Sequence, residues 1–149
     1  MRHEPLSVVL PDAIEFAKRI GDREFERWCR LELYGYGAQG GMQETDTVPD
    51  YRAVTGRWID GSGRVLDLSA YDDLSIVNRY RFRSGVKMLE ELAKRTEMQN
   101  LADDSFRQLL RQHVGFDAAR FCFNPVELVT ALDLIKNMLA EKLRASMRE

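Results

Sequence analysis

The chain has 149 residues, of which 44% are hydrophobic and 31% are charged. This length and composition are typical of one soluble globular domain, residues 1–149, that buries a single core. The formal net charge of −2 gives no long-range attraction to nucleic acid or to an anionic membrane. No apolar run approaches the roughly 20 residues that span a bilayer, and the N-terminal segment does not resemble a signal peptide. We therefore expect a cytoplasmic protein with no membrane partner.

The residues that usually carry enzyme chemistry are few and isolated. Cys29 and Cys122 stand in apolar surroundings without CxxC spacing, and we expect both to be reduced, buried thiols. The only histidines, His3 and His113, neighbour no cysteine or carboxylate at ligand spacing. Walker, HExxH and GxSxG motifs are absent, and the glycine-rich run at residues 37–41 is followed by no lysine and no helix at the spacing that phosphate binding requires. The sequence accordingly predicts no catalytic residue, no metal, no cofactor and no hydrolase or nuclease activity.

The N-terminal third predicts two helices. Residues 6–20 place apolar side chains at helical spacing, with Pro11 as either a kink or a first-turn residue. Gly21 ends this helix and Asp22 is a favourable N-cap for the next, which extends to residue 36. Because the link is so short, the two helices are predicted to form a hairpin.

One carboxylate lies at the centre of an otherwise apolar and aromatic face of this second helix. The face consists of Phe25, Trp28, Cys29, Glu32 and Tyr36. Burying a carboxylate costs several kcal/mol unless it is paired or protonated. Glu32 is therefore either a general base or metal ligand in a cleft, or one half of an internal ion pair. We favour the ion pair, with Arg52 as the partner.

The middle of the chain predicts a small sheet. A glycine-rich polar loop follows Tyr36, and residues 51–59 are rich in β-branched and aromatic types, which predicts a strand. The turn signal DGSG precedes residues 64–68, which alternate as a second strand, so a β-hairpin is expected. Residues 76–83 also alternate and predict either a third strand or the start of a helix.

As a strand, residues 76–83 would place three arginines on one side: Arg79, Arg81 and Arg83. Such a row is able to contact the phosphates of a nucleic acid. More often it is a solvated protein surface, and the near-neutral net charge favours that interpretation.

The C-terminal half is predicted to be helical. A first helix begins at Ser84, and a second begins at Asp103 or Asp104 and closes at Gly115. Asn124, Pro125 and Glu127 then form a strong start signal, with a cap, a first-turn proline and a capping box. The terminal helix extends to about Met147. The fold class is therefore α+β and mainly helical, with about five helices and a small β-hairpin or three-stranded antiparallel sheet.

Two spaced motifs resemble a known family. The pattern W-x-x-x-E-L-x-G-Y is formed by Trp28, Glu32, Leu33, Gly35 and Tyr36, and P-x-Y-R is formed by Pro49, Tyr51 and Arg52. Together they resemble AbiTii domains, small domains of bacterial proteins grouped with abortive-infection systems of phage defence. The segments FRSGVKMLEEL and NPVELVTALDLIKNMLAEKL are similar to the central and terminal helices of that family. The resemblance covers nearly the whole chain and implies a role in bacterial antiviral defence.

Two functional hypotheses are compatible with these features. The first is a non-enzymatic protein-interaction or oligomerisation module that uses the motif Trp28, Glu32, Tyr36, Tyr51 and Arg52 together with the hairpin surface. The second is a nucleic-acid-binding protein or small nuclease-type toxin that uses Glu32 and the arginine row. Concentration-dependent assembly favours the first hypothesis, and salt-dependent nucleic-acid affinity favours the second.

The terminal helix predicts a homodimer. Its main apolar stripe consists of Leu128, Leu132, Ile135, Leu139 and Leu143. Val129 and Met138 widen the apolar surface to roughly half the circumference, whereas a helix packed only within its own domain needs a stripe of about 100°. The extra width fits a two-fold contact with a second copy. The alternative is that the hairpin or the first helix of the same chain covers it.

Overall fold

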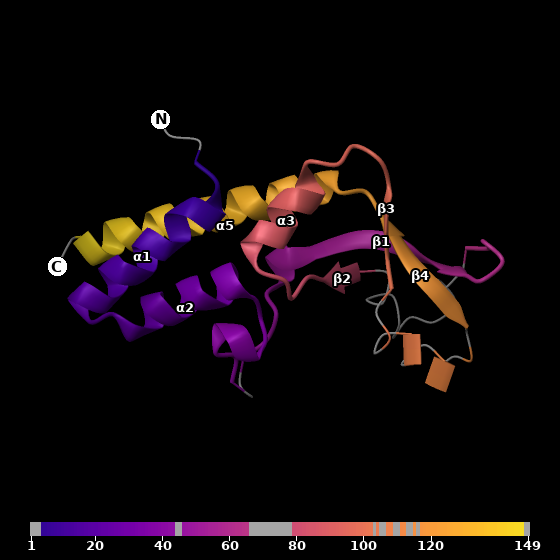
Figure 1. Ribbon diagram of the computed structural model, residues 1–149, viewed down its shortest axis with the longest axis horizontal. Helices are drawn as coiled ribbons and strands as arrows, with labels where there is room; N and C mark the ends of the chain where they lie inside the picture. The colour runs from indigo at the N-terminus through magenta and orange to yellow at the C-terminus, as the bar shows by residue number, and fades with distance from the viewer. Residues whose placement is uncertain are drawn as a thin grey trace.

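The computed structural model describes residues 4–43, 46–65, 79–102, 104, 107–108, 111–112, 115 and 117–147. Within these residues, the labelled helices are α1 (Leu6–Ile20), α2 (Arg23–Tyr34), α3 (Val86–Ala93) and α5 (Val126–Met147), with short 3-10 turns η1 (Ala38–Gly40) and η2 (Asp50–Arg52). The strands are β1 (Ala53–Asp60), β2 (Arg79–Arg81), β3 (Gln99–Leu101) and β4 (Ala118–Phe123), which form one antiparallel sheet in the order β2-β1-β4-β3. The α1–α2 hairpin lies at one end of the molecule and the sheet extends to the other, while α5 runs from beside α1 to α3 and the start of β1 (Figure 1).

The predicted helical hairpin is confirmed at both of its caps. Gly21 takes the left-handed conformation at φ 74°, and its N–H contacts the carbonyls at the end of α1. The Asp22 carboxylate accepts a hydrogen bond from the Phe25 N–H at 3.1 Å, which satisfies one of the free donors of α2. Pro11 lies inside α1 rather than in its first turn, because the helix already begins at Leu6.

The sheet is larger than the sequence predicted. The strand predicted at residues 51–59 is β1, and the described part of the segment 76–83 is β2, which pairs with β1. The expected hairpin partner at 64–68 contributes only a bridge from Val65 to Ile59, and residues 66–68 lie outside the described part of the chain.

The predicted antiparallel sheet is present, but strands β3 and β4 were missed, so it has four strands rather than the two of a hairpin or three. The β4 sequence AARFCF is a short apolar run, and periodicity alone does not separate such a run from a buried helical segment. Strand β3 is the three-residue sequence QNL, which is too short to show alternation. Both strands depend on pairing with β1 or with each other, which is a long-range contact.

The remaining predicted helices are present where the structure describes them. α3 begins at Val86, two residues after the predicted start. For the helix expected from Asp103 or Asp104, the described residues Asp104, 107–108 and 111–112 are helical, whereas its apolar positions lie outside the described residues. Gly115 has φ 71° and donates its N–H to the Arg111 carbonyl, which is typical of a helix end.

The start of α5 differs from the predicted capping box. The Asn124 side chain accepts the Val126 N–H at 3.0 Å, as a cap does. The Glu127 carboxylate, expected to cap its own helix, instead accepts the Thr55 N–H, with both oxygens at 3.2 Å. Glu127 therefore links the start of α5 to β1 at the point where β4 has ended and no longer supplies a carbonyl acceptor.

The core lies between the inner face of the sheet and the helices. Val54 and Trp58 of β1 and Phe121 of β4 are completely buried, and they pack in one cluster with leucines of α1, α3 and α5. Ring centroids of the inner-face aromatic residues lie 5.0–6.3 Å apart, within the usual range for favourable aromatic pairs. A Cβ at Gly56 would lie 2.6 Å from the Phe121 ring and nearer still to the Cys122 carbonyl oxygen, so this position requires a glycine.

Candidate functional site

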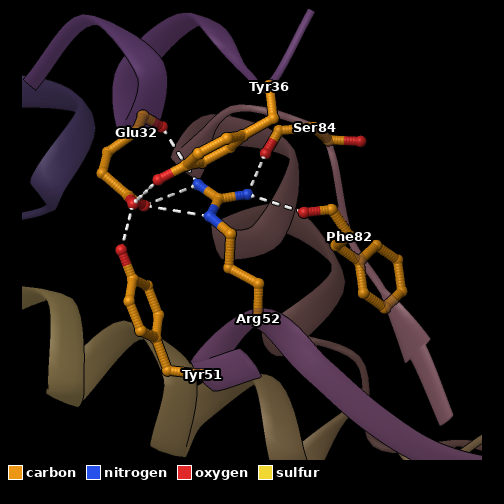
Figure 2. Close-up of polar contacts among 6 residues, drawn as sticks. All are labelled: Glu32, Tyr36, Tyr51, Arg52, Phe82 and Ser84. Atoms are coloured by element: carbon orange, nitrogen blue, oxygen red, sulfur yellow. Dashed lines mark hydrogen bonds and ion pairs between the residues drawn. The ribbon is translucent and has the colours of Figure 1, made fainter. Parts of the chain in front are cut away.

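A buried polar cluster joins α2 to the sheet. Glu32 lies in the last turns of α2 and Arg52 ends η2, directly before β1 (Figure 2). Both side chains have no solvent exposure. Glu32 points inward because Cys29 and Phe25, one and two turns earlier on the same face, are buried in the core.

The predicted ion pair between Glu32 and Arg52 is confirmed. Arg52 Nε lies 2.9 Å from Glu32 Oε1 and Nη2 lies 2.8 Å from the same oxygen. Nη2 also donates to the Glu32 carbonyl at 3.2 Å. Nη1 donates to the carbonyls of Phe82, at 3.0 Å, and Ser84. These contacts use every N–H direction of the guanidinium, which is why burying this cation is tolerated.

The second carboxylate oxygen is occupied by two phenols. The hydroxyls of Tyr36 and Tyr51 both donate to Glu32 Oε2 (Figure 2). The Tyr36 ring also covers Arg52, with Cζ 4.9 Å from the ring centroid, a cation–π contact. We call these four residues, Glu32, Tyr36, Tyr51 and Arg52, the Glu32–Arg52 cluster.

Tyr36 reaches this cluster from outside the helix on which it was predicted. α2 ends at Tyr34, and Gly35 follows with φ 106°, a conformation that favours glycine. The Tyr36 N–H then donates to the Arg83 carbonyl at 2.7 Å. The chain turn after α2, rather than the helical period, therefore brings the Tyr36 hydroxyl to Glu32.

Two glycines allow the end of α2 to approach the segment after β2. A Cβ on Gly35 would lie 2.8 Å from the Arg83 carbonyl, and a Cβ on Gly85 would lie 2.1 Å from the Leu33 carbonyl. The sequence prediction missed Gly85 and the backbone acceptors Phe82 and Ser84. Only a glycine preceding an apolar helix marked that segment, and this signal is not specific.

The environment of the two tyrosines keeps them protonated. Burial, and next the negative charge of Glu32, raise the pKa of Tyr36 well above its usual range. The same two causes raise the pKa of Tyr51, while the neighbouring side chains of Tyr36 and, less strongly, Trp28 act in the opposite direction. Both phenols therefore remain hydrogen-bond donors to the carboxylate at physiological pH. With two donors on each of its oxygens, Glu32 is arranged as a structural acceptor rather than as a base that faces a substrate.

Trp28, the remaining residue of the predicted motif, lies beside the cluster. Lys142 Nζ from α5 lies 5.1 Å from the centroid of its ring. The indole Nε1 is buried and forms no well-aligned hydrogen bond within the described residues. Trp28 also lines an open cleft of about 380 Å³ between α2 and the segment 46–49. At its rim Arg27 pairs with Asp46, and this hydrogen bond holds the pKa of Asp46 below its usual range.

The three arginines of the predicted row do not form one row. Arg79 and Arg81 lie in β2 with exposed side chains, and Arg81 pairs with Asp50. Arg83 is exposed but lies beyond the end of β2, where its carbonyl serves Tyr36.

Cys29 and Cys122 are not joined to each other in a disulfide, and the described residues contain no cluster of histidine, cysteine and carboxylate side chains suited to a metal ion. Burial raises the pKa of the Cys29 thiol to about 12, which makes it a poor nucleophile. Cys122 is only half-buried, contrary to the expectation for it. His3 and His113 lie outside the described residues.

The fold and the cluster together define a small α+β domain in which a buried ion pair joins a helical hairpin to an antiparallel sheet. The AbiTii family model matches residues 2–142, and the chain therefore belongs to the AbiTii family. This confirms the resemblance seen in the two motifs, and membership suggests a role associated with abortive infection, a form of defence. No curated protein and no solved structure gives a significant match. Within the described residues, no helix combines the length and the apolar character that crossing a membrane requires.

Proposed function

We propose that this chain is a non-enzymatic interaction module of a bacterial abortive-infection system, and that it assembles as a homodimer through α5. One observation carries the proposal. α5 buries its main stripe, including Leu128 and Ile135, within its own domain but leaves neighbouring apolar side chains in solvent. Val126 is 59% exposed and Val129 is 42% exposed, one turn apart on the same helix.

The alternative to a dimer is that other parts of the same chain cover the apolar side chains on either side of the main α5 stripe. The contacts of α5 within the domain bear on this alternative. α3 and α1 both contact α5, and Met138 is half-buried. On that flank Met138 is partly covered by its own domain, whereas Leu134, one turn earlier on α5, is 43% exposed. Val129 lies on the opposite flank of the stripe, so the proposed contact centres on Val126 and Val129 rather than on Met138.

The Glu32–Arg52 cluster supports a non-enzymatic role. Its charges and hydroxyls are directed at one another and at backbone carbonyls. In this arrangement the motif holds α2 against the sheet and keeps both elements rigid. A rigid domain presents an interaction surface with little loss of conformational entropy on binding.

The test is the oligomeric state of Val129→Lys. On the proposed model, sedimentation gives a concentration-dependent dimer for the wild type and a monomer for the variant, with an unchanged melting temperature. Ile20→Lys is the matched control, because Ile20 is 46% exposed at the far end of α1, and it should remain dimeric. A wild-type protein that is monomeric at high micromolar concentration would rule out the dimer.

A further inference from the structure

Four arginines from three strands share the outer face of the sheet. Residues directly opposite one another in an antiparallel sheet point to the same side, and successive residues of a strand alternate. Val54 and Trp58 of β1 are buried in the core, so Thr55 and Arg57 point outward. The pairs Ala53–Arg81, Thr55–Arg79, Arg57–Cys122 and Ile59–Arg120 then extend the outer face across β2, β1 and β4.

These arginines form a single diagonal file. Arg81 and Arg79 are two residues apart on β2, which corresponds to roughly 6.6 Å along a strand. Arg79 is opposite Thr55 and is thus a diagonal neighbour of Arg57, and Arg120 is likewise a diagonal neighbour of Arg57. Diagonal neighbours lie about 7–8 Å apart. Measured along β1, the file therefore advances by two residues at each arginine. Arg81 and Arg79 stand opposite residues 53 and 55, Arg57 lies on β1 itself, and Arg120 stands opposite residue 59.

Two described carboxylates lie near this file: Asp50, which pairs with Arg81, and Glu127, which accepts the N–H of Thr55 opposite Arg79. Arg57 and Arg79 are exposed and form no ion pair with a described residue. Arg120 Nε donates to Asn100 Oδ1 at 3.1 Å, a neutral contact that orients the guanidinium and keeps its charge. Asp50 pairs with Arg81 at the edge, in a contact exposed to solvent on both sides. β1 ends in Asp60, after a β-bulge, and the Asp60 carboxylate accepts the N–H groups of Ser62 and Arg64 in the following turn.

We propose that this outer sheet face binds the phosphodiester backbone of a single nucleic-acid strand, with Arg57, Arg79 and Arg120 as phosphate ligands and Arg81 joining them after release from Asp50. Guanidinium groups match phosphate oxygens with two parallel hydrogen bonds. A single file spaced at about 7 Å follows successive phosphates of one strand, whereas a duplex presents two backbones separated by a groove. The net charge of −2 does not oppose this contact, because salt screens charges beyond about 8–10 Å.

The surface proposed here is distinct from the α5 surface proposed for self-association, so the two proposals are tested separately. The probe is a short fluorescein-labelled oligouridylate, titrated with the full chain and followed by fluorescence anisotropy. We expect binding at low salt, with a logarithmic salt slope of about −3 for four phosphate contacts on a single strand. An oligothymidylate should bind equally well, because the contacts are to phosphate, and a duplex of the same length should bind more weakly.

Arg57→Gln with Arg79→Gln removes the centre of the file without touching the core. This double variant should weaken binding about tenfold or more and reduce the salt slope to about −1.5. Arg19→Gln with Arg144→Gln is the matched control: it removes the same charge from exposed positions on α1 and α5, and its affinity should stay within about twofold of wild type.

Cys122 provides an independent readout, because it lies directly opposite Arg57 on the proposed face. Bound oligouridylate should slow alkylation of Cys122, while buried Cys29 serves as the unreactive reference in the same molecule. Any of four results would overturn the proposal: no binding at low salt, equal losses in both double variants, tighter binding to duplex, or full competition by polyglutamate at equal charge. The first would show that no strand binds, and the others would assign the surface to nonspecific charge, to duplex or to an acidic protein.

Discussion

Every N–H group of the Arg52 guanidinium donates to an acceptor inside the protein, and a lysine ammonium has too few N–H groups to do the same. Lysine supplies three N–H groups on one atom, whereas arginine spreads its donors over a planar fork. At this position the fork joins a carboxylate on α2 to two carbonyls beyond β2. The residue type therefore decides whether three separate segments are held at one point.

Glu32→Gln should destabilise the protein by about 3–5 kcal/mol. The substitution keeps the shape of the side chain but leaves the buried Arg52 charge without its counterion. The measurement is the urea midpoint together with the slope of the transition. Glu26→Gln breaks the partly exposed pair with Arg30 and should cost no more than about 0.5 kcal/mol. Equal midpoints for Glu32→Gln and wild type would contradict the stabilising role of the buried pair.

Arg52→Lys tests the fork rather than the charge. The cation is retained, but at least one of the carbonyls of Phe82 and Ser84 loses its donor, and an unsatisfied buried acceptor costs about 1–3 kcal/mol. We expect a loss of stability in that range by chemical denaturation. A lysine variant as stable as wild type would show that charge alone is sufficient at this position.

Alkaline pH should unfold this protein through its buried phenols. Tyr36 and Tyr51 have raised pKa values in the folded state, against an ordinary value of 10.0. Above pH 10 the unfolded chain has therefore lost protons that the folded chain still binds, and stability falls as the pH rises. Each phenol contributes up to about 1.4 kcal/mol per pH unit in this window. The stabilising effect is complete below pH 10.

The measurement for this effect is the free energy of unfolding between pH 8 and pH 11 in a Cys29→Ala background, which removes the titration of that thiol. Tyr36→Phe with Tyr51→Phe should flatten the alkaline decline while lowering stability at neutral pH. If the double variant shows the same alkaline slope as the background protein, the two phenols are not the groups responsible.

At the scale of elements, α2 and the segment before α3 approach so closely that a side chain does not fit between them. Gly85 has an ordinary φ of −65°, so its requirement is steric rather than conformational. The hydrogen bond from Tyr36 N–H to the Arg83 carbonyl forms at the same crossing. This crossing positions the backbone acceptors that Arg52 needs.

Gly85→Ala should therefore destabilise the protein by about 1–3 kcal/mol, the usual cost of overpacking. The added Cβ would meet the Leu33 carbonyl at 2.1 Å, and backbone has to move to relieve the contact. Gly61→Ala is the control, because nothing lies within 4 Å of a Cβ at that position. Thermal unfolding compares the two variants, and similar melting temperatures would show that the crossing is not tight.

At the scale of the whole molecule, the two proposed surfaces belong to different elements. Self-association is assigned to α5, and strand binding to the outer face of the sheet, whose inner face packs on the helices. Taken together, the two proposals give a dimer with two strand-binding faces, one on each protomer.

The variants of the two surfaces should consequently act independently. Val129→Lys should abolish dimerisation while keeping the affinity of one protomer for oligouridylate within about twofold, since Val129 belongs to α5 and is not one of the proposed phosphate ligands. Arg57→Gln with Arg79→Gln should weaken oligouridylate binding and leave the sedimentation of the free protein unchanged. Loss of both properties in either variant would mean that one surface serves both.

The sequence alone determined the features that depend on neighbouring residues, such as helix ends, and the ion pair that a buried carboxylate requires. Gly21, Asp22 and Asn124 mark helix ends because each cap satisfies backbone groups within its own turn. The pairing of Glu32 with Arg52 could also be predicted, since a carboxylate on an apolar helical face requires an internal cation. The family motifs contain the same residues, together with the glycine that follows α2.

Only the tertiary structure decided which segments meet across long stretches of sequence. Strand β4 lies beside β1 although some 60 residues separate them, and no local pattern encodes that pairing. Tyr36 reaches Glu32 through a turn rather than through helical spacing, and Arg57 and Arg120 join Arg79 only because three strands align in register. The register of the strands is set by which side chains are buried on the inner face. Which residues become neighbours on the outer face therefore follows only once the strands are paired.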